Sequence, residues 1–364
     1  MKILKSAMMP TLIVLATILA GFSCGSNGGS NPPPGGDFPF NTAIQYDTGI
    51  YPAVAGVENT NVVVEMHNDP DHEILYYHVG TVDADNCTMN WGPSQTNYLD
   101  GINPSISVSD GAIVAEVHSG TANSTNGNEA DGSIWTTIGI ANVESNFIAW
   151  GSSQQIDSNA YYPSIAISRD SGIAVVVYQD NNKDGHETTL YYRVGTVDVV
   201  NQTINWGPRN GFTGGWQPSI AMNDRGDIVS VHNSWQENES LWYEVGALNT
   251  TNLTVSWGPT ITFDSAELGA KVAISNYHDG GGIGPSGSQL ITVFPSRKND
   301  NTFWMDLAVG PNMTDRTIAW NGLGRAYDSG GSQGIAIVYR GVMLEAHDNG
   351  YGGVLAKLWY KLGC

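Results

Sequence analysis

Positively charged residues are scarce in this chain of 364 residues. It has 15 lysines and arginines against 35 aspartates and glutamates, which gives a formal net charge of −20. A surface with this balance repels polyanions, so the composition predicts no nucleic-acid partner. Cations and neutral polar ligands remain open as partners, and the acidity also favours solubility in an extracellular setting.

The common catalytic signatures are absent. The chain has no His-Glu-x-x-His and no phosphate-binding loop. Residues 168–172 resemble the Asp box of sialidases, but no aromatic residue follows and no arginine cluster accompanies them, so we interpret them as a turn between strands. The sequence therefore predicts a non-enzyme. A glycosidase that uses two of Glu65, Glu116 and Glu345 stays open, because the sequence does not give their separation.

A helical period is also absent after the first residues. The one long apolar run extends from residue 8 to residue 20, follows Lys2 and Lys5, and is too short to span a bilayer stably. We interpret residues 1–23 as a signal peptide of the lipoprotein type. The mature protein is then expected outside the cytoplasm.

The residues around the first cysteine suggest a lipid anchor. Residues 19–24 resemble a bacterial lipobox, in which the cysteine, here Cys24, takes a diacylglycerol, but Gly21 stands where a typical box has leucine. Lipidation at Cys24 and simple secretion both stay open. Residues 24–41 are rich in Gly, Ser, Asn and Pro and predict a linker. We expect a monomeric outer-membrane or cell-surface lipoprotein, otherwise a secreted protein, with no membrane contact except through the lipid.

One short segment recurs six times in the rest of the chain. Its copies are 74–80, 133–139, 189–195, 240–246, 303–310 and 357–363, and each ends in glycine. The first four glycines are each followed eleven residues later by a tryptophan, and the fifth is followed ten residues later by Trp320. Tandem repeats of this length are typical of propellers and solenoids.

Each unit reads as four short strands. They are Pro-Ser-Ile-Ala, Val-Val-Glu-x-His, Leu-Tyr-Tyr-x-Val-Gly and Thr-Ile-x-Trp-Gly, with period-two alternation and turn residues between them. Four strands in a unit of about 50 to 60 residues form one blade of a β-propeller. Residues 42–364 therefore predict an all-β, six-bladed propeller of four-stranded blades, with the Tyr pairs and the recurring tryptophans packed between blades.

The chain ends predict how the ring closes. The sixth unit stops at Cys364 without a fourth strand, whereas residues 42–49 read as a fourth strand without the other three. The N-terminal strand thus completes the last blade. This closure places Cys87 and Cys364 near each other, and export to an oxidising compartment favours a disulfide between them, with two free thiols as the alternative.

Polar residues recur where the second strands end and the first strands begin. In a propeller blade these ends open on one face, and Glu and His two residues apart share one side of a strand. The candidate ligand-binding residues are Tyr51, Glu65, His67, Asn103, Glu116, His118, Tyr162, Gln179, Trp216, His232, Glu345 and His347. Hydrogen-bonding groups beside aromatic rings suit sugars. Alternatively, the Glu and His residues tie strand ends to loop amides in every repeat.

One loop suggests a metal. Asp180, Asn182 and Asp184 occupy positions one, three and five of a calcium-type loop, with glycine at position six. The twelfth position is Tyr191 rather than glutamate, so calcium and an ordinary polar hairpin loop both stay open. No cofactor is required by any other feature.

The units resemble the repeats of secreted bacterial lectin-like β-propellers. The resemblance rests on segments such as residues 190–198, 203–208 and 162–166, and it covers residues 42–364. It implies sugar sites within or between blades, although the degenerate fifth and sixth copies put a sixfold set in doubt. The first hypothesis is a surface-displayed carbohydrate-binding protein. The alternatives are a scaffold that binds cell-surface proteins, or a glycoside hydrolase.

Overall fold

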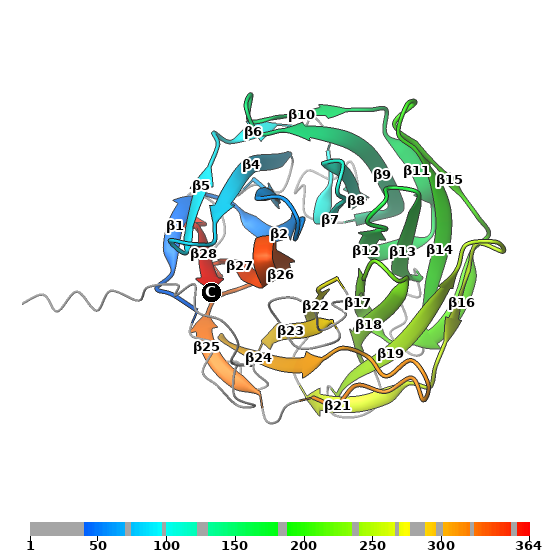
Figure 1. The fold of residues 1–364 in the computed structure, drawn as a ribbon. Coiled ribbons are helices and arrows are strands. Elements are labelled where there is room, and N and C mark those ends of the chain that lie inside the picture. The colour runs from blue at the N-terminus through cyan, green and yellow to red at the C-terminus, as the bar shows by residue number, and fades with distance from the viewer. Residues whose placement is uncertain are drawn as a thin grey trace, which may run out of the picture.

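Six antiparallel sheets are arranged as a ring around a central axis in the computed structural model (Figure 1). The structure describes residues 40–69, 74–96, 100–121, 130–180, 188–234, 240–265, 269–276, 288–295, 301–320, 324–350 and 355–364. The chain is an all-β, six-bladed propeller with four-stranded antiparallel blades, as the repeat predicts. No helix in these ranges is long and apolar enough to cross a membrane.

Blades 1 to 3 follow one another along the chain. Blade 1 contains β2 (Ile50–Gly56), β3 (Val62–Asn68), β4 (Leu75–Asp83), β5 (Thr88–Trp91) and β6 (Gln95–Thr96). Blade 2 contains β7 (Ile102–Val108), β8 (Ile113–Thr121), β9 (Ala130–Asn142), β10 (Phe147–Trp150) and β11 (Gln154–Asp157). Blade 3 contains β12 (Ala160–Ile167), β13 (Ile173–Asp180), β14 (Thr189–Asp198), β15 (Thr203–Trp206) and β16 (Asn210–Gly214).

Blades 4 to 6 complete the ring. Blade 4 contains β17 (Trp216–Met222), β18 (Asp227–Asn233), β19 (Ser240–Asn249), β20 (Thr254–Trp257) and β21 (Ile261–Ser265). Blade 5 contains β22 (Lys271–Ile274), β23 (Gln289–Pro295), β24 (Thr302–Val309) and β25 (Arg325–Ser329). Blade 6 contains β26 (Gln333–Val338), the 3₁₀ turn η1 (Tyr339–Gly341), β27 (Val342–Asp348), β28 (Leu358–Gly363) and, from the other end of the chain, β1 (Ile44–Asp47).

The outer strand of blades 1 to 4 is interrupted. In blade 1, β5 and β6 both pair with β4, and Gly92 and Pro93 separate them. Proline cannot donate a hydrogen bond to a strand ladder, so the strand breaks there and resumes further along the same partner. In blade 6, β1 takes the place of β6: Gln45 pairs with Trp359 and Asp47 with Leu358 on β28.

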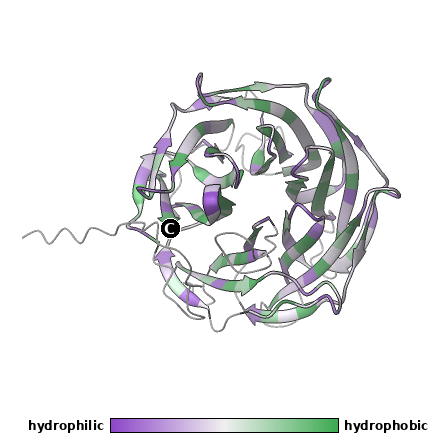
Figure 2. Cartoon of the chain, in the orientation of Figure 1, coloured by the Kyte–Doolittle hydropathy of each residue, from purple (hydrophilic) through white to green (hydrophobic). Residues whose placement is uncertain are grey.

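The core lies between the blades. Six clusters of buried apolar residues each combine side chains from two neighbouring blades. On β3, Val64 and Met66 pack toward blade 2, whereas Val63 packs toward blade 6, because successive side chains of a strand point to opposite faces. In Figure 2 the hydrophobic segments are accordingly spread over the strands of all six sheets.

The recurring tyrosines and tryptophans pack across these junctions, as predicted. The rings of Tyr77 and Trp150 lie edge to face with their centroids 5.8 Å apart, and those of Tyr192 and Trp257 repeat this geometry at 5.8 Å. The tyrosine hydroxyl also accepts a hydrogen bond from the outer strand of the next blade, for example from Ile148 N at 3.3 Å. One side chain thus supplies both packing and a backbone partner at the junction.

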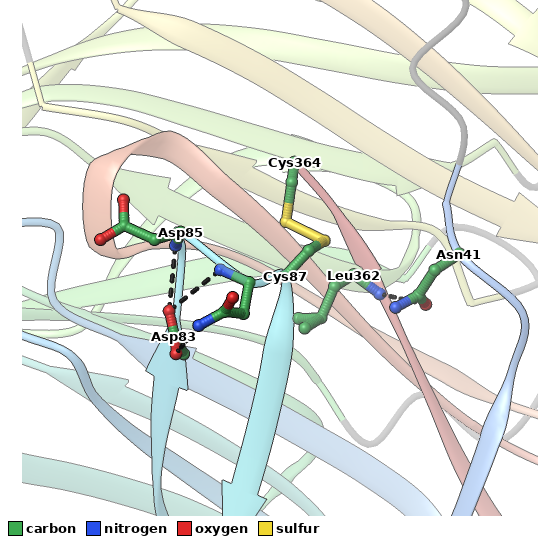
Figure 3. Close-up of a disulfide and its surroundings, with 7 residues drawn as sticks. Asn41, Asp83, Asp85, Cys87, Leu362 and Cys364 are labelled. Atoms are coloured by element: carbon green, nitrogen blue, oxygen red, sulfur yellow. Dashed lines mark hydrogen bonds between the residues drawn. A yellow bond between two sulfur atoms is a disulfide. The ribbon is translucent and has the colours of Figure 1, made fainter. Parts of the chain in front are cut away.

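A disulfide joins the two ends of the ring. Cys364, after β28, is bonded to Cys87, in the turn between β4 and β5, with an S–S distance of 2.08 Å (Figure 3). Asn41 pairs with Leu362 beside it, with Leu362 N donating to the Asn41 side chain at 3.0 Å. We call the junction between blades 6 and 1 the seam. It is closed by β1 and by this covalent bond.

Candidate functional site

The glutamates and histidines of the second strands lie inside the junctions. Glu65 and Glu116 are fully buried, and His67 and His118 are 1% and 2% exposed. His67 Nδ1 is 3.0 Å from the Glu65 carboxylate, His118 Nδ1 is 2.7 Å from Glu116, and blade 6 repeats the pair with Glu345 and His347 at 3.0 Å. The expectation that these side chains stand on an open face was wrong. They do share one side of each strand, but that side packs against the preceding blade.

His232 differs from the other histidines. Its own strand has Ser230 instead of glutamate, and His232 Nδ1 instead lies 3.3 Å from Glu244 on β19. Both residues are buried. Each of these junctions therefore holds an acid beside its histidine, but the acid comes from different strands.

Gln179 does not occupy the position of the histidines on the second strands. By strand pairing, Val177 corresponds to Met66, so Tyr178 occupies the histidine position and Gln179 corresponds to Asn68. Their hydrogen bonds agree, because the Gln179 side chain accepts from Gln217 N at 3.0 Å and the Asn68 side chain from Asn103 N at 3.2 Å. The bulge on the neighbouring strand, and not the end of the polar segment, sets this register.

The residues before the prolines that recur in blades 1 to 4 have a strained backbone. Tyr51, Asn103, Tyr162 and Gln217 have φ angles of 54°, 54°, 49° and 47°, in the left-handed region that side chains other than glycine rarely adopt. Each lies at a register shift in the innermost strand of its blade. The following proline makes this conformation still less favourable. We call these four residues the rim, since they stand where the innermost strands begin.

Side chains of the neighbouring blade hold the rim in place. Tyr51 N donates to the Asp348 carboxylate at 3.1 Å, in the same way that Asn68 and Gln179 accept from the rim residues of blades 2 and 4. Tyr51 is 39% exposed, and the other three rim residues are half-buried. Burial, the Asp348 carboxylate and the nearby Tyr162 raise the pKa of Tyr51. Trp216, half-buried at the start of β17, adjoins the rim at Gln217.

The rim is uneven. The corresponding positions of blades 5 and 6 are Gly269 and Ser332, so the four larger side chains come from blades 1 to 4 only. Beyond the rim a cavity of about 120 Å³ is lined by the innermost strands. Its lining combines apolar residues of all six blades, namely Val54, Ile106, Ile165, Ile220, Val272 and Ile335, with polar ones that include Glu58, Asp110 and Arg169. This volume is far below the roughly 300 Å³ of small ligand pockets, so the cavity is too small to enclose an organic ligand.

Two groups of residues bear on metal binding. Asp180 ends β13, while Asn182 and Asp184 of the predicted calcium loop lie outside the described residues, as does Cys24. Within the described ranges, Asp47, His67 and His78 place one potential ligand atom each within 4.8 Å of the others. Sequence reasoning missed this group because β1, β3 and β4 meet only when the ring closes.

Charges inside the seam are strongly coupled. Burial opposes the ionisation of Asp47, but hydrogen bonds from His78 and from Thr48 N lower the pKa of Asp47 to about 2. Burial also opposes the positive charge of His78, yet its hydrogen bond to Asp47 and the Glu65 carboxylate raise its pKa. The seam therefore holds a carboxylate hydrogen-bonded to an imidazole.

The turn that resembles an Asp box has a structural role. Asp170 accepts from Gly172 N at 3.0 Å, and Ser168 Oγ accepts from Ile173 N at 2.9 Å. These bonds close the hairpin between β12 and β13, with Ser171 at a φ of 62°. The interpretation of residues 168–172 as a turn is confirmed.

Comparison with known proteins identifies the fold. No family model and no curated protein matches the sequence. Among solved structures, an α-L-arabinanase of Penicillium chrysogenum, solved in complex with arabinobiose, has a TM-score of 0.57 at 11% identity over 89% of this chain and 98% of that one. A sialidase of Streptococcus pneumoniae has a TM-score of 0.59 at 10% identity over 89% and 70%. A protein of unknown function from Dyadobacter fermentans has a TM-score of 0.57 at 10% identity over 88% and 95%. At such identities the similarity concerns the fold alone.

Proposed function

We propose that this protein binds glycans at the rim. The observation that carries the proposal is the strained backbone of Tyr51, Asn103, Tyr162 and Gln217. In three of the four blades the rim N–H donates to a side chain of the neighbouring blade, which holds this backbone in place. Strain of about 1–3 kcal/mol per residue persists where the position of a side chain matters. Here it presents two phenol rings and two amides around one axis.

This set of groups matches the chemistry of a sugar. An aromatic ring stacks on the apolar C–H face of a pyranose, and amide groups both donate to and accept from its hydroxyls. The arabinanase of similar fold was solved with arabinobiose, which supports a sugar as ligand without specifying which one. The rim positions of blades 5 and 6, Gly269 and Ser332, add no further aromatic ring or amide group to this set.

Binding is better supported than hydrolysis by the glutamates. Glu65, Glu116 and Glu345 lie in three different junctions, each buried and hydrogen-bonded to its own histidine. A glycosidase needs two carboxyl groups about 5 to 9 Å apart across one glycosidic bond. These three side chains do not meet at one accessible place.

A glycan array with the purified protein tests the proposal. We expect Tyr51→Ala and Tyr162→Ala each to weaken binding to the selected glycan at least about fivefold, because each removes a stacking surface. Phe147→Ala is the matched control, since Phe147 is an aromatic residue 50% exposed on the outer strand β10. Full binding in both tyrosine variants would contradict a role for the rim. The absence of any bound glycan would favour the scaffold hypothesis.

We further propose that the protein acts outside the cytoplasm, tethered through Cys24. The disulfide between Cys87 and Cys364 supports export, since such bonds persist in oxidising compartments. Incorporation of labelled palmitate into the wild-type protein, and its loss in Cys24→Ala, is the expected result. A wild-type protein that stays unlabelled and soluble would instead support simple secretion.

A further inference from the structure

Three side chains from three strands converge at the seam. Asp47 comes from β1, His67 from β3 and His78 from β4. His78 Nε2 lies 2.8 Å from Asp47 Oδ2, and His67 Nε2 lies 3.8 Å from the same oxygen. Both imidazoles are at most 5% exposed, whereas the Asp47 side chain is 24% exposed, so the group reaches solvent through its carboxylate.

Nδ1 of each imidazole already has a hydrogen-bond partner. His67 Nδ1 is 3.0 and 3.1 Å from the two oxygens of Glu65, and His78 Nδ1 is 2.8 Å from Gly92 O. A nitrogen that faces a carboxylate or a carbonyl oxygen is the donor, so each ring carries its hydrogen on Nδ1. Nε2 of both rings faces the Asp47 carboxylate, and it is the atom that would exchange its hydrogen for a metal ion. Metal-binding histidines typically have such an outer carboxylate or carbonyl partner.

The junction between blades 5 and 6 provides an internal comparison. Asp328, Glu345 and His347 repeat the arrangement, with His347 Nδ1 3.0 Å from Glu345 and His347 Nε2 3.7 Å from Asp328. In that junction Lys361 stands at the position of His78, and its Nζ lies 2.8 Å from Asp328. The same acids therefore surround a built-in cation in one junction. In the seam they surround an imidazole, which can instead offer a lone pair.

We propose that Asp47, His67 and His78 bind a divalent first-row transition ion, with Zn²⁺ as the best match. Two imidazole nitrogens and one carboxylate, with a water molecule as the fourth ligand, form a common tetrahedral zinc site with bonds of about 2.0–2.2 Å. Cu²⁺ competes for the same ligands, whereas Ca²⁺ and Mg²⁺ prefer oxygen alone. The ion takes the place of the hydrogen on His78 Nε2 and links β1 to blade 1.

The site would fasten the seam at a second point. The disulfide holds the turn between β4 and β5, while Asp47 pairs with Leu358 at the beginning of β28, near the opposite end of that strand. An ion bound only by the folded ring stabilises it in proportion to the logarithm of the free ion concentration. The inference is independent of glycan binding at the rim.

Titration of the chelator-treated full-length protein with Zn²⁺ tests this site. Calorimetry is expected to show one saturable equivalent, and the unfolding midpoint is expected to rise with free Zn²⁺. Co²⁺ serves as a spectroscopic probe, because tetrahedral nitrogen and oxygen coordination gives it a visible absorption. The absence of a saturable equivalent in the wild-type protein would overturn the proposal.

Two variants copy one junction into the other. His78→Lys gives the seam the lysine of the junction between blades 5 and 6, so it preserves a positive charge beside Asp47 and should fold. We expect it to bind Zn²⁺ more than about tenfold more weakly. Lys361→His completes the same ligand set around Asp328 and is expected to add a second equivalent. If His78→Lys binds Zn²⁺ as tightly as the wild-type protein, the ion lies elsewhere and the proposal fails.

Discussion

Individual polar residues in the junctions are stabilised by specific partners. A buried charge is costly unless it is paired and hydrogen-bonded, and removing one partner leaves the other uncompensated. Glu65, Glu116 and Glu345 each have a histidine two residues away, and in blade 3 Tyr178 donates to Asp157 at 2.9 Å instead. These four junctions therefore vary in sequence while each keeps a hydrogen-bonded polar contact.

In the junction between blades 4 and 5 two carboxyl groups, those of Asp264 and Asp306, face each other. This pair predicts a pH dependence. Burial and the adjacent Asp264 carboxylate raise the pKa of Asp306 to about 7. The folded state then binds a proton that the unfolded state releases near pH 4, so between about pH 4 and 7 this group makes the protein less stable as pH rises. Asp306→Asn, which imitates the protonated form, should stabilise the protein at pH 8 by about 2–4 kcal/mol and have little effect at pH 4.

Thermal unfolding of the wild-type protein and Asp306→Asn across this pH range measures the difference directly. Groups away from this pair titrate equally in both proteins, so the difference in unfolding midpoint between the two proteins reports on Asp306 and its neighbour Asp264. A difference in unfolding midpoint that stays constant from pH 4 to pH 8 would contradict the raised pKa of Asp306.

One glycine is required by the histidine that faces it. A Cβ atom added at Gly101 would lie 2.4 Å from Cδ2 of the buried His118 ring, and Gly49 and Gly215 meet His67 and His232 in the same way. In blade 3, where tyrosine replaces the histidine, the equivalent residue is alanine, at position 160. Glycine and histidine therefore vary together between repeats.

Gly101→Ala is expected to destabilise the protein by about 1–3 kcal/mol, because the added methyl overpacks a closed site. Gly111→Ala is the matched control, since the nearest atom to its added Cβ lies at 3.6 Å. Chemical denaturation of both variants measures the two effects. Equal stabilities would show that the His118 ring moves aside at no cost.

Sequence reasoning reached the repeat but not the environment of each residue. The spacing of glycine, tryptophan and proline predicts the blades because every copy must place the same packing groups. The pattern Glu-x-His shows that two side chains share a side, but it does not tell whether that side faces solvent or the next blade. A usable signal was missed, since an aspartate follows an apolar or aromatic residue at Asp47, Asp157, Asp264 and Asp328, in the outer strands that contact the next blade.

At the scale of elements, the outer strands determine how neighbouring blades are joined. Within the described residues, β1 supplies blade 6 with the counterpart of β6, and no strand there corresponds to β5. The disulfide between Cys87 and Cys364 lies at the end of β28 that β1 does not cover. It therefore joins blade 6 to blade 1 at the end of the seam where β1 makes no contribution.

The variant Cys87→Ser/Cys364→Ser tests the contribution of this bond. The bond closes a loop with a sequence separation of 277 residues, and loss of such a bond typically costs about 2–5 kcal/mol. We expect a lower unfolding midpoint with an unchanged fold by circular dichroism. The wild-type protein should show the same loss of stability when its disulfide is reduced. A variant as stable as the oxidised wild-type protein would show that β1 alone closes the ring.

At the scale of the whole molecule, closure depends on a strand of four residues. β1 covers the edge of β28, and Tyr46 stacks on Trp91 of blade 1 with ring centroids 5.4 Å apart. Without β1, β28 would expose unpaired backbone groups, and such edges readily pair with another chain. Blade 1 would also lose its packing partner at the seam.

Deleting residues 1–49 should therefore open the ring, whereas deleting residues 1–39 should not. The longer deletion removes the buried contacts of Tyr46 and the Asp47 carboxylate as well as the strand, and we expect a loss of more than about 3 kcal/mol. We also expect oligomers in size-exclusion chromatography, because one copy can supply an edge to another. The shorter deletion retains β1 and controls for removal of the signal peptide and most of the linker. Since the disulfide remains in both proteins, a difference in unfolding midpoint between them reports on β1 itself. If the two proteins unfold together and both stay monomeric, closure rests on the disulfide and on the packing of blade 6 against blade 1.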